Sequence, residues 1–183
     1  DHVANLGSYA NFLRDERKDI EGAETLYKRA LAADPTDADN LGNQMENAGI
    51  PWRSYQESMG TPCNLDTAGT YAPKHDPFLY FSNIQTAPNG LCDARNVDYT
   101  EFPADLAAGT YKYMWLTPNL VNDGHNPTND PVKGLKQSDA WLSKEVPKSL
   151  ASDACKNGDV IFITWDEAEG RDGVDEDLAF HRA

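Results

Sequence analysis

A dense run of apolar residues lies at positions 160–165, where five of the six side chains are apolar and polar ones do not alternate with them. A strand buried on both faces has this pattern, and such strands form the middle of parallel α/β sheets. Asp166 and Glu167 follow directly, where the carboxyl end of the strand and the ligand crevice of the sheet would lie. The alternative is that the two carboxylates simply end the strand and begin a polar turn.

The segment before this run predicts a second strand and a long helix. Residues 111–116 are typical of a strand, and residues 132–150 carry apolar side chains at helical spacing, with a break expected near Pro147. Strand, helix and strand in this order form a βαβ-like unit with a right-handed crossover. We therefore expect an α/β fold, in which flanking helices cover a parallel sheet.

The middle of the chain is less regular. Residues 41–49 predict a helix that ends at a C-terminal glycine, Gly49. We expect a short extended piece at 50–52 and a second helix over 53–59. Residues 62–89 are rich in turn-forming residues, apart from an apolar cluster at 77–81.

Residues 1–36 have a different pattern, with two apolar faces at helical spacing that predict an αα-hairpin. The spacing of Ala23, Tyr27, Ala30 and Pro35 resembles the second helix of a tetratricopeptide repeat. A lone repeat cannot bury its own apolar face, so residues 1–36 are a candidate surface for a protein partner. We accordingly divide the chain into a hairpin, residues 1–40, and a second domain, residues 41–183.

Composition limits the classes of partner. The chain has 183 residues, and its 16 basic and 30 acidic residues give a net charge of −14. This balance argues against nucleic acid as a partner, because phosphate backbones are bound by surfaces rich in Lys and Arg. No window is apolar enough for a membrane span. If the protein handles phosphate, a metal ion or a local cationic group must overcome the overall repulsion.

Three cysteines are present. Cys63 and Cys92 bracket part of the turn-rich region. A disulfide between them would close a loop of roughly thirty residues and stabilise the fold by about 3–4 kcal/mol. Such a bond would suit an exported protein; the alternative is two unrelated thiols. Cys155 is the third, and no spacing of Cys and His residues suggests a zinc site.

Two further polar clusters could carry chemistry. Lys74 and His75 are adjacent in a turn with flanking prolines and could grip an anion, or could be an ordinary solvent-exposed pair. Asn119, Asp123 and His125 follow the strand predicted over 111–116. Asp123 and His125 would point the same way in an extended stretch, and a carboxylate with an imidazole suits metals and phosphoryl oxygens. The alternative is an ordinary turn rich in Asn, Asp and Gly.

These clusters, in this order, resemble the phosphoesterase family that contains bacterial acid phosphatases and phospholipase-C-like enzymes, within the alkaline-phosphatase-like superfamily. The resemblance covers about residues 41–177. The matching pieces are 48–52 with 55–59, Tyr-Ala-Pro-Lys-His-Asp-Pro-Phe at 71–78, Thr-Pro-Asn-Leu-Val-Asn-Asp-Gly-His at 117–125, Asp-Ala-Trp-Leu at 139–142 and Phe-Ile-Thr-Trp-Asp-Glu at 162–167.

The resemblance implies metal-dependent hydrolysis of phosphate esters by a secreted or periplasmic hydrolase. Asp166 and Glu167 would hold a divalent metal ion that polarises phosphoryl oxygens. His75 and His125 would be catalytic and would stabilise charge or protonate the leaving oxygen. Lys74, Asn119 and Asp123 would bind the substrate.

This sequence departs from the family in its first part. The family's first metal motif and its nucleophile lie in an earlier half of the domain, whose place is taken here by the hairpin. The sequence also contains no Gly-x-Ser-x-Gly motif, phosphate loop or evident Ser/His/Asp triad. We therefore expect weak or absent phosphatase activity in this chain. The alternative is a non-catalytic scaffold that binds a partner through the hairpin.

Overall fold

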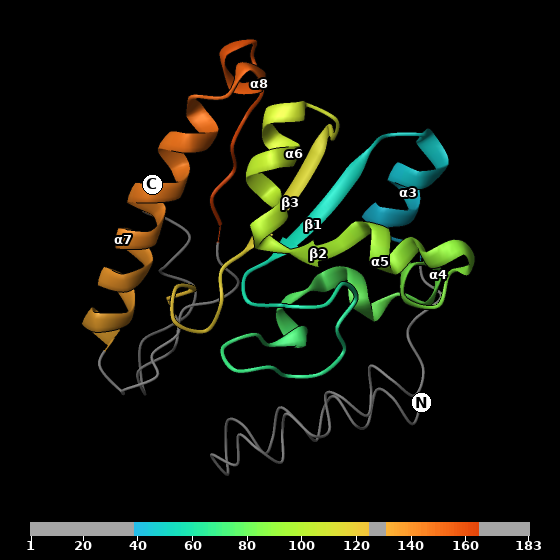
Figure 1. The fold of residues 1–183 in the computed structure, drawn as a ribbon, viewed down its shortest axis with the longest axis horizontal. Coiled ribbons are helices and arrows are strands. Elements are labelled where there is room, and N and C mark those ends of the chain that lie inside the picture. The colour runs from blue at the N-terminus through green and yellow to red at the C-terminus, as the bar shows by residue number, and fades with distance from the viewer. Residues whose placement is uncertain (1–38, 125–130, 165–183) are drawn as a thin grey trace, which may run out of the picture.

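A computed structural model describes residues 39–124 and 131–164 (Figure 1). The predicted hairpin therefore lies almost wholly outside the described residues, and the division of the chain at residue 40 stays a prediction. Trp165, Asp166, Glu167 and His125 also lie outside them.

The centre of the fold is a parallel sheet of three strands in the order β2-β1-β3. Gln56, at the end of β1, is aligned with Asp98 of β2 and with Thr117 of β3, so the three carboxyl ends meet at one edge of the sheet. This arrangement confirms the α/β class and the predicted strand in the region 111–116. The strands are β1 (Trp52–Gln56), β2 (Asn96–Asp98) and β3 (Tyr113–Thr117).

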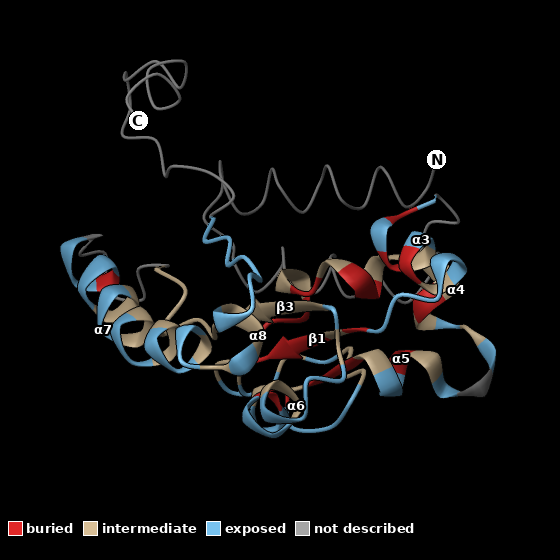
Figure 2. Ribbon diagram, turned by 90° about the horizontal axis from the view of Figure 1, so that it is seen from above, coloured by how far each residue is buried: buried red, intermediate tan, exposed pale blue. Residues whose placement is uncertain are grey.

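One face of the sheet is covered by short helices from both sides of β1 in the sequence. Trp52 of β1 stacks on Phe78 with ring centroids 4.5 Å apart, and Met45 and Ile84 complete the buried cluster. In Figure 2 the central strand β1 is drawn largely in the colour of buried residues. The covering elements are α3 (Leu41–Ala48), η2 (Pro77–Tyr80) and α4 (Ser82–Gln85).

The opposite face packs against η4 (Tyr99–Glu101) and α6 (Phe102–Ala108). Tyr55 meets Phe102 edge to face at 5.2 Å, and its hydroxyl donates to Asp105 Oδ2 at 2.9 Å. Arg53 lies on the same face and also pairs with Asp105, at 2.7 Å. The sheet is thus covered on both faces, as a parallel sheet requires.

The predicted first helix is confirmed as α3. Asn40 caps its start by accepting a hydrogen bond from the Asn43 amide at 3.0 Å. Gly49 ends it with φ of 63°, a left-handed conformation that glycine adopts without a steric penalty. The remaining short elements are η1 (Pro73–His75), η3 (Pro88–Gly90), α5 (Leu91–Arg95) and α8 (Asp153–Lys156).

The helix predicted over 53–59 is wrong, because this stretch forms most of the central strand β1. The polar residues Ser54 and Gln56 obscured the strand pattern. Both are buried, and Gln56 Nε2 donates to Ser54 Oγ at 2.8 Å. Their burial depends on contacts with distant residues, which local sequence patterns do not contain.

The predicted long helix is confirmed as α7 (Pro131–Leu150), but the break expected at Pro147 is wrong. Pro147 lies in the last turn, and the Ala151 amide donates to its carbonyl at 3.0 Å, so the helical path continues past it. Tyr99 ties α7 to the rest of the fold. Its hydroxyl donates to Glu145 Oε2 at 2.6 Å, and its ring lies 5.7 Å from that of Trp141.

The buried strand predicted at 160–165 is also wrong for the residues that the structure describes. Residues 160–164 form no strand, and the side chains of Val160 and Phe162 are 70% and 88% exposed. The expected βαβ unit after β3 is therefore not formed in the described part of the chain. A buried strand needs a hydrogen-bonded neighbour and cover on both faces, and apolar composition alone supplies neither.

The disulfide predicted between Cys63 and Cys92 is confirmed, with the two Cα atoms 5.4 Å apart. It joins the loop after β1 to α5, close to the start of β2. The backbone supports this join, because the Cys63 amide donates to the carbonyl of Asn96 at 2.9 Å. Cys155 is a free thiol.

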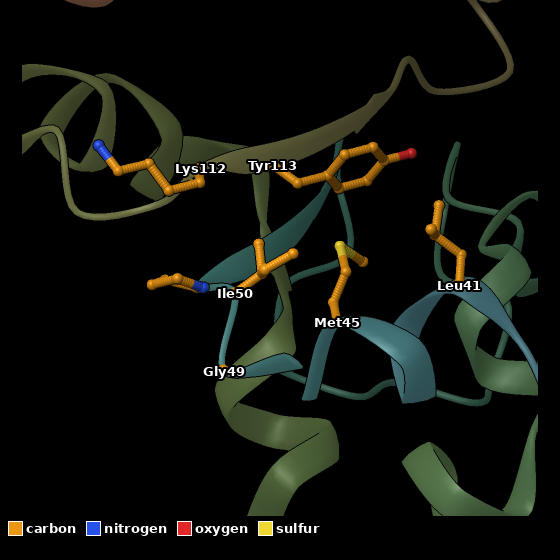
Figure 3. A pocket seen from close by; sticks show the side chains of 7 residues that line it. Leu41, Met45, Gly49, Ile50, Lys112 and Tyr113 are labelled. Atoms are coloured by element: carbon orange, nitrogen blue, oxygen red, sulfur yellow. The ribbon is translucent and has the colours of Figure 1, made fainter. Parts of the chain in front are cut away.

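An apolar pocket of about 620 Å³ opens at the amino ends of β1 and β3 (Figure 3). Leu41 and Met45 of α3, Ile50 before β1 and Tyr113 of β3 line it, and Lys112 lies at its edge. It lies at the opposite end of the sheet from the carboxyl edge. Within the described residues, no helix combines the length and the apolar character needed to cross a bilayer.

Candidate functional site

The carboxyl edge of the sheet carries the polar residues expected of a ligand site. β1 continues into Glu57 and Ser58, and β3 continues into the loop at residues 118–124. The Glu57 amide donates to the Thr117 carbonyl at 3.0 Å, which extends the pairing of the two strands by one bond. The two loops therefore leave the sheet side by side.

The structure brings together two of the sequence-predicted site residues, His75 and Asp123. His75 Nδ1 lies 3.5 Å from Asp123 Oδ2, and the two side chains are 30% and 13% exposed. The His75 carbonyl also accepts a hydrogen bond from Thr117 Oγ1 at 3.4 Å, so η1 is held against the end of β3. A carboxylate at Nδ1 orients an imidazole ring.

Lys74 precedes His75 within η1 and is partly buried. Its place in a short turn that starts at Pro73 agrees with the sequence-based expectation of a turn fixed by prolines. Its backbone position beside His75 puts a second cationic side chain in the same turn as the His75–Asp123 pair.

Asn119 lies in the loop after β3, but the hydrogen bonds of its side chain are made within the protein. Its Nδ2 donates to Ser58 Oγ at 3.0 Å, and its Oδ1 accepts from the Val121 amide at 3.0 Å. Its carbonyl accepts from the amides of Asn122 and Asp123, each at 2.9 Å. These contacts make Asn119 the residue that shapes the loop carrying Asp123.

Sequence reasoning passed over Asp76, which is fully buried next to His75. Its Oδ1 accepts from the Phe78 amide at 3.2 Å and lies 3.5 Å from Ser54 Oγ, whereas Oδ2 has no hydrogen-bond partner among the described residues. Burial raises the pKa of this carboxyl to about 7, against the lowering effect of its hydrogen bonds. An aspartate flanked by His and Pro gave no sign in the sequence that it would be enclosed.

Glu57 is the second residue that sequence reasoning passed over. Its carboxylate accepts from the Asn119 amide at 2.9 Å, from Asn122 Nδ2 at 3.0 and 2.9 Å, and from Trp141 Nε1 at 3.2 Å. The sequence signal was available, because a carboxylate directly after a strand faces the same edge as the polar residues after its neighbour. The helix predicted over 53–59 hid that position.

The described residues do not form a metal site. No group of three or more His, Cys, Asp or Glu side chains within residues 39–124 and 131–164 is placed to hold an ion. His75 and Asp123 offer one nitrogen and one oxygen, donor types that suit a divalent metal in kind but are too few to hold one. The proposed ligands Asp166 and Glu167, and the proposed catalytic residue His125, lie outside the described residues.

The sequence profile of the Phosphoesterase family matches residues 7–177. The chain belongs to this family. A phosphatidylinositol-3-phosphatase of Mycobacterium tuberculosis is 30% identical over 133 residues, which cover 72% of this chain and 40% of that protein. A probable acid phosphatase of Kluyveromyces lactis is 25% identical over 144 residues, covering 74% of this chain and 32% of that protein. An acid phosphatase of Aspergillus niger is 25% identical over 140 residues, with 73% and 32% coverage.

Membership of the Phosphoesterase family confirms the resemblance carried by the polar clusters. The match begins at residue 7, inside the segment interpreted as a separate hairpin. The likeness of that segment to a tetratricopeptide repeat and the alkaline-phosphatase-like superfamily stay predictions. This phosphoesterase-family chain spans 40% of the first relative and 32% of the other two. No solved structure matches it.

Proposed function

We propose that this protein takes part in the hydrolysis of phosphate esters and that the phosphoryl group binds at the carboxyl edge of the sheet. The observation that carries the proposal is the His75–Asp123 pair, 3.5 Å apart at that edge, in a chain of the Phosphoesterase family. The similarity to three phosphatases supports the reaction type.

His75 is the residue proposed to act on the phosphoryl group. Asp123 at Nδ1 would hold the ring in place, and the second ring nitrogen would donate to a phosphoryl or leaving-group oxygen. A positioned acid of this kind contributes about 10²–10⁴-fold to a rate. His125, two residues after Asp123, is proposed to assist it.

Lys74 and His75 together would supply the local positive charge that the protein lacks as a whole. The net charge of −14 repels an anionic ester at long range, whereas cations inside the site act over a few ångströms in a lower dielectric. Asn119 would contribute indirectly, because its hydrogen bonds fix the loop that carries Asp123.

Asp166 and Glu167 are proposed to hold a divalent metal ion. A bound ion would polarise the phosphoryl oxygens and lower the pKa of the attacking group. The proposed compartment is the cell exterior or the periplasm, since the Cys63–Cys92 disulfide is stable under oxidising conditions.

The test is the hydrolysis of p-nitrophenyl phosphate by the chain with added Mg²⁺, Ca²⁺ or Zn²⁺. We expect slow turnover that a chelator removes and that His75→Ala and Asp166→Ala each reduce by at least about tenfold. Lys74→Ala should raise KM more than it lowers kcat, because a lysine that binds the phosphate stabilises the bound substrate and the transition state equally.

The matched control is Lys112→Ala, which removes a cation at the other end of the sheet and should leave turnover unchanged. Turnover that survives both His75→Ala and Asp166→Ala would refute the proposed residues. A chain that releases no p-nitrophenol with any of the three metals would favour the alternative, a non-catalytic scaffold.

A further inference from the structure

Glu57 joins three separate parts of the molecule through a single carboxylate. It lies directly after β1, and both of its carboxylate oxygens accept hydrogen bonds from the loop after β3, through the Asn119 amide and Asn122 Nδ2, at 2.9–3.0 Å. Oε1 also accepts from Trp141 Nε1 of α7 at 3.2 Å. Donors from the loop and from α7 therefore converge on the end of β1.

The backbone next to Glu57 is strained. Ser58 has φ of 68°, in the left-handed region that residues other than Gly, Asn and Asp seldom occupy. Its hydroxyl accepts from Asn119 Nδ2 at 3.0 Å and from Thr70 Oγ1 at 3.3 Å. A strained conformation of this kind persists only where surrounding contacts determine it, and such positions concentrate at functional sites.

The contacts of Glu57 lead to the His75–Asp123 pair in two steps. Glu57 fixes Asn119 through its backbone amide, and the Asn119 carbonyl in turn accepts from the amide of Asp123 at 2.9 Å. Asp123 then meets His75 at 3.5 Å. Movement of Asn119 would therefore carry Asp123 away from the imidazole.

We propose that Glu57 is a positioning residue for the phosphate site, which sets the place of Asp123 and His75 without touching the substrate. This inference rests on the proposed function, because it assigns Glu57 to the same site. Hydrogen bonds to a carboxylate are short and strong, so loss of Glu57 would remove the strongest of the contacts that hold the loop. A displacement of about 1 Å in such a site costs a large factor in binding or rate.

The test is titration of the chain with inorganic phosphate, followed in NMR spectra of the amide signals. Glu57→Ala should weaken phosphate binding by about tenfold or more. Glu57→Gln should lose less, because its one remaining oxygen can still accept from the Asn119 amide, although its new amide group would face the donors Asn122 Nδ2 and Trp141 Nε1. The matched control is Glu46→Ala, since Glu46 accepts from Trp52 Nε1 at 2.7 Å and from Arg95 Nε at 2.6 Å, away from the carboxyl edge.

Glu46→Ala should destabilise the protein without altering phosphate affinity beyond about twofold. A second readout separates Glu57 from the phosphate proposal. The Asn119 amide proton should resonate downfield in the wild type because its acceptor is charged, and it should shift upfield in Glu57→Ala but not in Glu46→Ala.

Each outcome decides one question. If wild-type chain does not bind phosphate, the proposed function fails, and an unmoved Asn119 signal in Glu57→Ala would overturn the positioning role as well. If phosphate binds equally well to Glu57→Ala and wild type, Glu57 does not position the site. A loss of affinity shared by Glu57→Ala and Glu46→Ala would show that general stability, rather than Glu57, sets the affinity.

Discussion

At the scale of single residues, the carboxyl groups of Asp76 and Asp123 lie in different environments. Asp123 is partly exposed and lies 3.5 Å from the imidazole ring of His75, whereas Asp76, the next residue after His75, is fully buried. Burial raises the pKa of Asp76 and therefore favours its neutral form. The two carboxyl groups thus have separate roles, Asp76 in packing and Asp123 in the proposed chemistry.

The raised pKa of Asp76 makes stability depend on pH. Its pKa rises from an ordinary value of 3.8 to about 7 in the folded chain, so the folded state binds this proton more tightly than the unfolded state. The contribution of Asp76 to stability is therefore complete below about pH 4 and is lost as the pH rises through about 7. Asp76→Asn removes this dependence. The free energy of unfolding of Asp76→Asn minus that of wild type should therefore increase by roughly 2–3 kcal/mol from pH 5 to pH 8, because the wild type loses stability over this range.

Urea unfolding at the two pH values measures this difference. Asp153→Asn is the control, because it removes the same charge from a side chain that is 96% exposed and should give the same difference from wild type at both pH values. A constant difference between Asp76→Asn and wild type would show that Asp76 does not take up a proton in this range.

At the scale of elements, the segment between Cys63 and Cys92 contains only short helices, η1, η2, α4 and η3, and is closed by the disulfide. Reduction, or the double change Cys63→Ala with Cys92→Ala, should lower the free energy of unfolding by about 3–4 kcal/mol, because the open loop gains conformational freedom when unfolded. Denaturant unfolding with and without dithiothreitol measures the loss.

Cys155→Ser is the control for thiol chemistry and should change stability by less than about 1 kcal/mol, since Cys155 is a free thiol near the C-terminal end of α8. Equal stability of the oxidised and reduced protein would mean that the loop is held by its other contacts, among them the Cys63 amide bond to Asn96.

Helices and strands with a clear local pattern of capping or apolar residues could be predicted from the sequence. The Gly49 cap and the apolar spacing of α7 predicted two helices, and the apolar run at the end of β3 predicted a strand. β1 was missed because its inward polar residues, Ser54 and Gln56, are buried by tertiary contacts. The strand predicted at 160–165 is wrong for the opposite reason. Its apolar residues predict a buried strand, but the described ones are exposed.

In the candidate site, too, features that depend on local sequence could be predicted, and features that depend on distant contacts could not. His75 and Asp123 could be singled out because their residue types and positions after a strand or in a fixed turn suggest chemistry. Their contact could not be predicted, because His75 and Asp123 lie in two different segments, 48 residues apart in sequence. Glu57 and Asp76 were missed because their roles depend on burial and on distant partners.

At the scale of the whole molecule, the described structure leaves four consecutive apolar residues, 160–163, exposed. All four side chains are at least 36% exposed, as are those of Val132 and Leu135 on α7. Exposed apolar stretches of this kind promote association. The double change Val160→Asp with Phe162→Asp should therefore reduce binding of the dye ANS and reduce self-association measured by analytical ultracentrifugation.

The control is Val160→Ile with Phe162→Leu, which keeps the apolar character and should leave both signals unchanged. If the double aspartate variant unfolds instead of self-associating less, that result would contradict the exposure of this segment. That result would favour the buried strand that the sequence pattern predicts at 160–165.

The central claim is that a phosphoryl group binds at the carboxyl edge of the sheet, beside His75 and Asp123. The most direct measurement is an NMR titration of the wild-type chain and of His75→Ala with inorganic phosphate, with signals assigned over residues 71–78 and 117–124. The account predicts saturable shifts in those two segments and an affinity at least about tenfold weaker in His75→Ala. Shifts that gather around Lys112 and Tyr113 at the apolar pocket, or an affinity unchanged in His75→Ala, would contradict it.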